Sequence, residues 1–220
     1  MITYSDNTFG LKNLPKYQFL FTFITYGNFI MMRYICLFVM ISISWIPNGH
    51  ALTPERPNFY EYQAKIVILN NKHYFESLVY EIKHAKVSLY ISMYLFKITK
   101  NPKNSVVIIV NELIKARKRG VDVKLLLEKS GFNRTLNSEN QKVAKKLRQN
   151  KISVCFDSLK TQTHTKVIVI DGYLSFIGSH NLSASALHWN NEISVLVKSK
   201  PIAKKILKNL RKIKGNRCFQ

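Results

Sequence analysis

Residues 164–181 read HTKVIVIDGYLSFIGSHN, two apolar runs joined by a short polar turn. Lys166–Ile170 and Tyr173–Ile177 are rich in β-branched and aromatic residues, which favour extended strands. Asp171 and Gly172 between them form a dipeptide typical of two-residue β-hairpin turns. The stretch therefore predicts a hairpin whose outer ends carry polar side chains.

Strand and helix patterns alternate on both sides of this hairpin. We expect the other strands at Ala64–Leu69, Lys86–Phe96, Val121–Glu128, Lys151–Asp157 and Glu192–Val197. Apolar residues at helical spacing predict helices at His73–Ala85, Ser105–Arg119, Ser138–Gln149 and Pro201–Lys214. Such alternation is typical of an α/β fold. Because several strands are apolar on both faces, we expect helices to cover both faces of the sheet.

Four polar side chains stand at the ends of the predicted hairpin. His164 and Lys166 are two residues apart on a strand, so they point to the same face. Ser179 and Asn181 have the same spacing in the loop after the second strand. An imidazole, an ammonium, a hydroxyl and an amide together suit an anionic phosphoryl group. No carboxylate cluster accompanies them, so we expect chemistry without a metal or another cofactor.

The fixed residues form the pattern H-x-K-x4-D-x6-G-S-x-N from His164 to Asn181, with Glu192 eleven residues later. This pattern resembles the signature of the phospholipase D superfamily, including its short secreted bacterial phospholipases and periplasmic endonucleases. The resemblance covers residues 60–215. It implies the phospholipase D/nuclease fold, an α/β architecture with a mixed β-sheet flanked by helices on both faces and one motif per chain.

The resemblance also implies a mechanism. His164 attacks phosphorus and forms a covalent phosphohistidine. Lys166, Ser179 and Asn181 hold the non-bridging oxygens and stabilise the charge that develops on them.

Two acidic residues complete the expected site. Glu192 is expected to form a hydrogen bond to the imidazole of His164 and to fix its tautomer. Asp171 is expected to support the site by ending the strand and bracing the loop.

The mechanism needs a second histidine to protonate the leaving alcohol and then activate water. His84 and Lys86 form another H-x-K, but Ile91 stands where the aspartate belongs, so we interpret them as a helix end running into a strand. His180 and His188 flank the site and are alternatives. The short one-motif relatives imply a simpler arrangement, a symmetric homodimer in which two active-site histidines meet at the twofold axis.

The N-terminal segment is mostly apolar from Phe19 to Ile46. A basic start after Met31, an apolar run at Tyr34–Ile46 and a small-x-small end at Gly49–Ala51 are the parts of a secretory signal. We therefore predict cleavage after Ala51 and a secreted or periplasmic protein. An uncleaved membrane anchor is the alternative, since the segment is long enough to span a bilayer.

These patterns divide the chain into three parts. Residues 1–51 are the signal peptide or anchor, of which residues 1–30 are not translated if synthesis starts at Met31. Residues 52–62 form a linker, and residues 63–216 form the catalytic domain.

The chain is strongly basic, with 34 Lys and Arg against 12 Asp and Glu and a formal net charge of +22. Such a balance is typical of proteins that bind nucleic acid or anionic membranes. Most of these basic residues are lysines, however, and a coding bias toward A/T-rich codons would produce the same pattern. The charge alone therefore does not identify the substrate.

Two substrate classes stay open, because the motif recognises only a phosphodiester. Our leading hypothesis is an exported phospholipase that converts phosphatidylcholine-type lipid to phosphatidic acid and an alcohol, acting at a membrane surface in virulence or membrane lysis. The alternative is a non-specific endonuclease that cleaves DNA or RNA by the same mechanism. Few arginines and no clear ladder of stacking aromatic residues count against the nuclease.

The remaining aromatic residues and cysteines carry weaker expectations. Tyr94 and Phe96 resemble an aromatic stretch near the active site of the phospholipase D superfamily, but we expect them in the core rather than in contact with substrate. Trp189 either contacts substrate or packs beneath its loop. The three cysteines, Cys36, Cys155 and Cys218, have no spacing typical of a zinc site or of a disulfide framework, so we expect neither.

Overall fold

The computed structural model describes residues 61–219. The expected signal peptide or anchor, its cleavage point after Ala51 and nearly all of the linker at 52–62 lie outside the described residues. Within residues 61–219, no helix is both long enough and apolar enough to cross a membrane.

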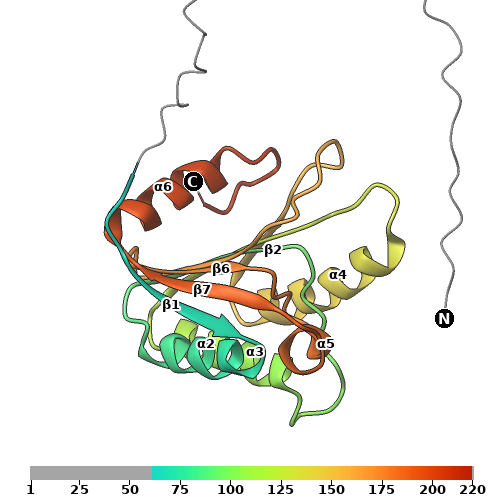
Figure 1. Ribbon diagram of the computed structural model, residues 1–220. Helices are drawn as coiled ribbons and strands as arrows, with labels where there is room; N and C mark the ends of the chain where they lie inside the picture. Colours follow the sequence, from blue (N-terminus) through green and yellow to red (C-terminus); the bar gives the residue numbers. More distant parts are fainter. Residues whose placement is uncertain (1–60, 220) are drawn as a thin grey trace, which may run out of the picture. The chain divides into compact units, whose positions relative to one another are not determined.

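A seven-stranded sheet forms the centre of the described domain, in the order β1-β7-β6-β5-β2-β3-β4 (Figure 1). Neighbours from β2 to β4 run parallel, and all other neighbours run antiparallel, so the sheet is mixed as expected. The strands are β1 (Lys65–Asn70), β2 (Ser88–Met93), β3 (Asp122–Leu127), β4 (Ser153–Phe156), β5 (Lys166–Ile170), β6 (Leu174–Gly178) and β7 (Ile193–Lys198).

Helices cover the two faces of the sheet unequally. The helices are α2 (Lys72–His84), α3 (Ser105–Lys118), α4 (Arg134–Gln149), α5 (Ala184–His188) and α6 (Lys200–Arg211). Helices α2, α3 and α4 pack on one face, and α6 lies over the other (Figure 1). The predicted α/β fold with helices on both faces is confirmed.

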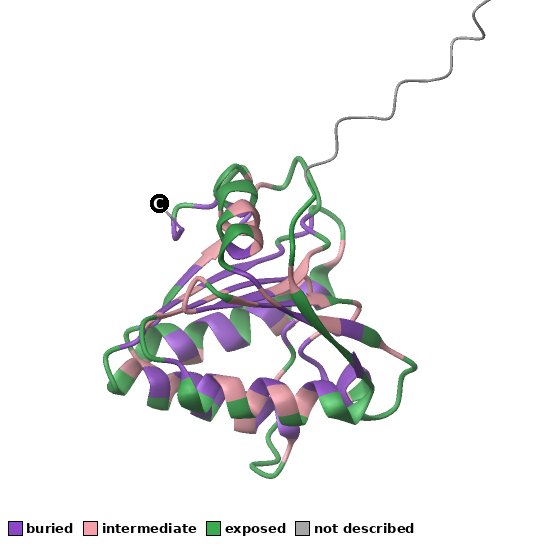
Figure 2. Ribbon diagram, turned by 60° about the vertical axis from the view of Figure 1, so that its left-hand side comes forward, coloured by how far each residue is buried: buried purple, intermediate pink, exposed green. Residues whose placement is uncertain are grey.

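Two separate hydrophobic cores result, and alternation along β3 shows how they form. Leu125 and Leu127 face the larger core under α2, α3 and α4, whereas Leu126 between them faces the smaller core under α6. Buried residues concentrate where helices and sheet meet (Figure 2). The larger core includes Leu78, Ile82, Ile109, Leu113, Ile168, Ile170 and Phe176, and the smaller one includes Leu210, Cys218 and Phe219.

Side-chain caps explain where the helices begin. Asn133 accepts a hydrogen bond from the backbone N–H of Leu136 at 2.9 Å, which satisfies a donor that the first turn leaves free. Helix α4 therefore starts at Arg134 rather than at the predicted Ser138. The short helix α5, which the sequence did not predict, is capped in the same way by Ser183.

The predicted hairpin forms between β5 and β6. Asp171 and Gly172 both have positive φ, at 53° and 59°, as a type I′ turn requires. The Asp171 carboxylate accepts hydrogen bonds from the backbone N–H groups of Lys86, Val87 and Ser88 at 3.0, 2.8 and 2.9 Å. Asp171 thus fixes the start of β2 to the turn.

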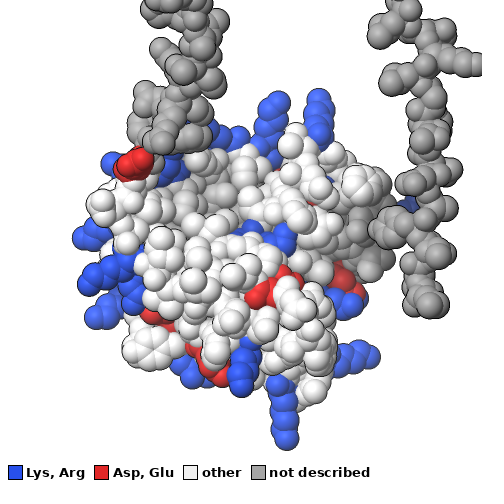
Figure 3. Space-filling view, viewed as in Figure 1, with Lys and Arg blue, Asp and Glu red and all other residues white. Residues whose placement is uncertain are grey.

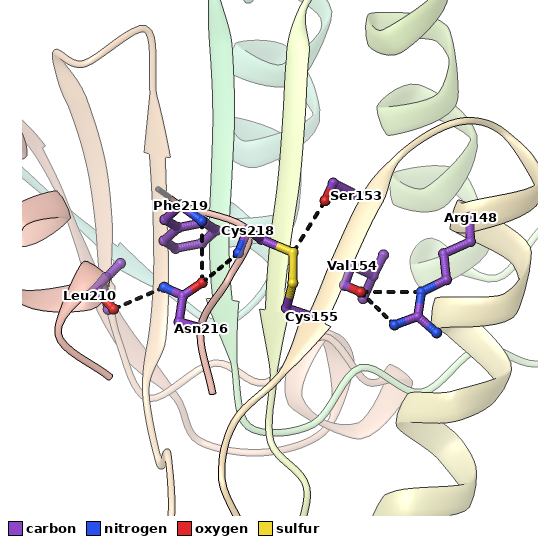
Figure 4. Close-up of a disulfide and its surroundings, with 8 residues drawn as sticks. All are labelled: Arg148, Ser153, Val154, Cys155, Leu210, Asn216, Cys218 and Phe219. Atoms are coloured by element: carbon purple, nitrogen blue, oxygen red, sulfur yellow. Dashed lines mark hydrogen bonds between the residues drawn. A yellow bond between two sulfur atoms is a disulfide. The ribbon is translucent and has the colours of Figure 1, made fainter. Parts of the chain in front are cut away.

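The expectation that no disulfide forms is wrong, because Cys155 and Cys218 are bonded to each other (Figure 4). Cys155 lies in β4 on the face covered by α6, and the segment after α6 folds back over that face. Asn216 shapes this segment by accepting from the N–H groups of Cys218 and Phe219 at 3.1 and 3.3 Å. A single pair separated by 63 residues has no spacing signature, so the sequence could not reveal it.

Candidate active site

The ends of β5, β6 and β7 bring the polar motif residues to one edge of the sheet. His164 lies two residues before Lys166, the first residue of β5, so the two side chains point to the same face. Lys166 Nζ lies 3.3 Å from His164 Nε2 and 3.5 Å from His164 Nδ1. Ile168 and Ile170 continue the same strand face into the larger core. A cationic group is therefore held beside the imidazole above a packed apolar floor.

Tyr94 is a site residue that the sequence prediction assigned to the core. Its ring lies 4.5 Å from the imidazole of His164 in an edge-on arrangement, and Lys166 Nζ lies 5.2 Å from its centre. Strand β2 ends at Met93, so Tyr94 leaves the sheet at the edge where the motif gathers, while Phe96 is fully buried as expected. The N–H of Tyr94 donates to Thr165 O at 2.8 Å, which ties it to the motif strand.

Glu192 was expected to bind the imidazole of His164, but its carboxylate binds Ser179 and Asn190 instead. One carboxylate oxygen accepts a short hydrogen bond from the Ser179 hydroxyl, and the other accepts from Asn190 Nδ2 at 3.0 Å. The strand order explains the difference, because Glu192 precedes β7 and Ser179 follows the adjacent β6, whereas His164 precedes β5 one strand further away. The interaction with Asn190 was not predicted either, and its only signal was proximity in sequence.

Electrostatic surroundings suit a nucleophilic imidazole. Desolvation, followed by the positive charge of Lys166, lowers the pKa of His164 below its usual value. Desolvation also lowers the pKa of Lys166, while the negative charge of Glu192 acts in the opposite direction. The imidazole is therefore neutral at neutral pH, which leaves a lone pair available for attack.

Asn181 presents an unpaired polar atom at this edge. Its Oδ1 is buried and has no hydrogen-bond partner among the described residues. A buried acceptor without a donor is costly, and such groups are uncommon in native folds. The described residues therefore give this amide oxygen no structural partner.

The glycine of the motif is needed for close packing. A Cβ on Gly178 would lie 2.2 Å from the Ser194 hydroxyl oxygen and 2.4 Å from its Cα. Gly178 and Ser194 are cross-strand partners in β6 and β7. Only glycine lets the two strands approach here, and this approach brings Ser179 to Glu192.

None of the other histidines considered for the second role pairs with His164 in the described structure. His180 is fully buried, stacks on Tyr74 at 4.2 Å and bonds to Ser194 Oγ at 2.8 Å. His188 ends α5 and bonds to the hydroxyl of Ser105.

The second H-x-K lies elsewhere, as interpreted from the sequence. His84 is the last residue of α2, and its Nδ1 lies 2.7 Å from the carbonyl oxygen of Tyr80. The chain then runs into β2, which confirms a helix end followed by a strand. Trp189, by contrast, is 76% exposed, so packing beneath its loop is not its role here.

Comparison with known sequences identifies the domain. The family model described as "Cardiolipin synthase, PLD-like domain" matches residues 78–214. A phospholipase D of Rickettsia prowazekii is 33% identical over 134 residues, which cover 60% of this chain and 58% of that protein. A cardiolipin synthase A of Wigglesworthia glossinidia brevipalpis is 30% identical over 127 residues, which cover 54% of this chain and 25% of that protein.

Comparison with solved structures identifies the fold. The crystal structure of Nuc from Salmonella typhimurium, a phospholipase D family member, matches with a TM-score of 0.56 and 24% identity, covering 68% of this chain and 93% of that chain. NucT from Helicobacter pylori matches with a TM-score of 0.54 and 21% identity, covering 69% and 96%. At these identities the structural matches establish the fold alone.

Proposed function

The chain belongs to the phospholipase D superfamily as a phosphodiesterase of that type, and we propose that it is an exported phospholipase that hydrolyses phosphatidylcholine-type lipids to phosphatidic acid and an alcohol. The observation that carries the catalytic part is the neutral imidazole of His164 held beside Lys166. A neutral nucleophile next to a fixed cation is the arrangement that attack on a phosphate anion requires.

In the proposed reaction, a ring nitrogen of His164 forms a bond to phosphorus while the bond from phosphorus to the alcohol oxygen breaks. The alcohol takes a proton from a second histidine, and Lys166 stabilises the negative charge on the phosphoryl oxygens. The second histidine then removes a proton from water, which attacks phosphorus and releases His164 and the phosphomonoester. The Ser179 and Asn181 side chains complete the phosphoryl site.

We propose that the second histidine is His164 of a second copy in a symmetric homodimer. The described residues contain one complete motif, so the second histidine is expected from another chain. An exposed apolar patch that a second copy would cover runs along β1 to Ile193, on the sheet face opposite to that of His164 and Lys166. Ile66, Ile68 and Ile193 are 61%, 66% and 62% exposed. Ile193 pairs with Asn70, so the three isoleucines share one sheet face, and Ile193 directly follows Glu192.

The choice of lipid over nucleic acid rests on the relatives and on the disulfide. The curated relatives with 30–33% identity over 129–134 residues include phospholipases D of several Rickettsia species, although the chain spans only 58% of their length. The bond between Cys155 and Cys218 favours an oxidising compartment, and hence export. Nucleic acid is the second candidate, favoured by the net charge of +22.

The distribution of charge bears on that choice. In the view of Figure 3, lysine and arginine side chains are spread around the outline rather than gathered in one stripe. A nucleic-acid groove is typically marked by such a stripe. The face drawn in Figure 3 therefore shows no stripe that would favour nucleic acid.

The substrate is tested with the purified secreted protein and with His164→Asn as the control. Phosphatidylcholine vesicles and supercoiled plasmid are incubated separately, both with EDTA so that contaminating metal-dependent nucleases are silent. Choline release without nicking supports the proposal. Nicking without choline release overturns it in favour of the nuclease, and equal action of the control shows contamination.

The homodimer is tested by mixing wild-type and His164→Asn subunits under conditions that allow exchange. If each reaction needs both histidines, an equal mixture has about one quarter of the activity of the same total amount of wild-type protein, because only wild-type homodimers are active. About one half of that activity would mean that each chain works alone. Ile68→Lys should weaken the dimer, with Val87→Lys as a control because Val87 is 66% exposed and lies beside the Asp171 turn.

A further inference from the structure

Two buried carboxyl groups lie directly behind the nucleophile. Glu128 follows β3 and Asp157 follows β4, and these parallel neighbours end at the same edge of the sheet. The two residues are 1% and 6% exposed. Both accept a hydrogen bond from the backbone N–H of Thr163, Glu128 at 2.5 Å and Asp157 at 3.1 Å. Thr163 immediately precedes His164, so the pair holds the backbone from which the imidazole projects.

Asn140 extends this support to the other side of the site. From α4, its Nδ2 donates to Tyr94 O at 2.8 Å and to Glu128 O at 2.9 Å, while its Oδ1 accepts from the N–H of Phe96 at 2.9 Å. Asn140 is itself fully buried. The segments that carry Tyr94 and Glu128 are thereby joined beneath the imidazole.

The two carboxyls cannot both be charged without cost. Their oxygens converge on one N–H in a water-poor site, where two negative charges repel strongly. Burial, followed by the hydrogen bond with Asp157, raises the pKa of Glu128 to about 7. Neither carboxyl belongs to a salt bridge within residues 61–219. The raised pKa of Glu128 therefore lets the pair hold one proton between its two carboxyl groups.

The other charged groups near the pair are directed elsewhere. Asp157 Oδ1 accepts from the backbone N–H of Lys129 at 2.6 Å. From α4, Arg148 donates to Val154 O and lies over the ring of Phe156. His164 is influenced by Lys166 rather than by the carboxyls. The charge that acts on Glu128 is therefore that of Asp157.

We propose that Glu128 and Asp157 are positioning residues that hold Thr163, and through it His164, in the attacking orientation by sharing one proton. The proposal rests on the nucleophilic role proposed for His164. When the pair loses its proton, the two carboxylates separate, the contact with Thr163 loosens and the imidazole loses its alignment.

The sign of the effect follows from the direction of the shift. A carboxyl whose pKa is raised on folding stabilises the fold most at low pH, and that contribution falls as pH rises toward its folded pKa. The aligned state should likewise fall about tenfold for each pH unit above about 7. We therefore expect kcat to decline at alkaline pH, and this decline should be the same whether or not the leaving group needs a proton.

The first test measures alignment without measuring catalysis. In full-length His164→Asn protein, the amide resonance of Thr163 is followed by NMR from pH 5 to pH 9. We expect it to titrate near pH 7 and to stop titrating when Glu128→Gln is added, because the amide of glutamine keeps a donor that cannot ionise. A Thr163 resonance that does not respond to pH overturns the proposal, whatever the fate of the proposed function.

The second test measures the reaction with bis(4-nitrophenyl) phosphate, whose leaving group departs without needing a proton. Wild-type kcat should fall about tenfold between pH 7.5 and 8.5, and Glu128→Gln should stay flat over that range. Glu112→Gln, at a glutamate 6% exposed and paired with Lys115, is the matched control and should behave as wild type. If Glu128→Gln declines with the wild-type midpoint, the pair does not position His164. If Glu128→Gln does not fold, Asp157→Asn is used, and it should also remove the decline.

Discussion

The tripeptide pattern H-x-K occurs twice in this chain, and the two copies have different structures. At residues 84–86 the histidine is the last residue of α2, exposed and bonded to its own helix. At residues 164–166 the chain enters β5, so the two side chains share one face and lie 3.3 Å apart. The difference teaches that the tripeptide carries no chemistry by itself, because only the strand brings its two groups together.

Asp171 connects the two copies. It belongs to the motif of the second copy, yet its carboxylate binds the backbone that directly follows the first, at Lys86, Val87 and Ser88. It lies at the far end of β5, with the whole strand between it and His164. The motif aspartate therefore has a structural role. The difference between the two copies can be tested by making the same substitution in each copy separately.

The largest expected effect comes from the histidines. His164→Asn should lower kcat by at least about 10³-fold, because it removes the nucleophile. His84→Asn, the matched control, should stay within about twofold of wild type. Rates are measured on one phosphodiester substrate at one pH. Equal losses in the two variants would remove the distinction between the copies.

The lysines should give the next largest effect. Lys166→Ala should lower kcat by about 10²–10³-fold, since a charge aimed at the developing phosphoryl anion is lost. Lys86→Ala should leave kcat unchanged. The assay is run at saturating substrate, so that a change in KM alone, which would indicate weaker binding only, is seen separately.

Sequence reasoning located the site residues better than it assigned their contacts. His164, Lys166 and Ser179 could be singled out from the sequence because strand periodicity and loop spacing are local properties. The partner of Glu192 was assigned wrongly because it depends on the strand order β7-β6-β5, which no local pattern encodes. The same holds for the bond between Cys155 and Cys218, whose partners meet only after the C-terminal segment folds back.

The missed residues share a physical cause. Tyr94 lies one residue beyond β2, and a boundary error of that size decides whether a side chain is in the core or in the site. Glu128 also stands one residue beyond its strand and was read as the end of that strand. Its role depends on Asp157 from another strand, so no pattern within one segment could indicate it.

A smaller effect is expected at Asp171. Asp171→Ala removes the acceptor for three backbone N–H groups at the start of β2, and should lower the free energy of unfolding by about 1–3 kcal/mol. The folded fraction should keep its kcat, because the residue does not reach the substrate. Urea denaturation and activity are measured on the same samples. Full stability with lost activity would instead place Asp171 in the reaction.

The smallest effect is a change in one pKa. Desolvation and the charge of Lys166 hold the pKa of His164 below its usual value, so the imidazole is neutral and competent at neutral pH, and it becomes protonated and inactive only as pH falls through that lowered pKa. Lys166→Met removes one of the two causes and should move the His164 titration, followed by NMR of the ring protons, to higher pH. A His164 titration that stays in place would mean that the lysine orients the substrate without acting on the nucleophile, and that burial at the strand entrance is what distinguishes the second H-x-K from the first.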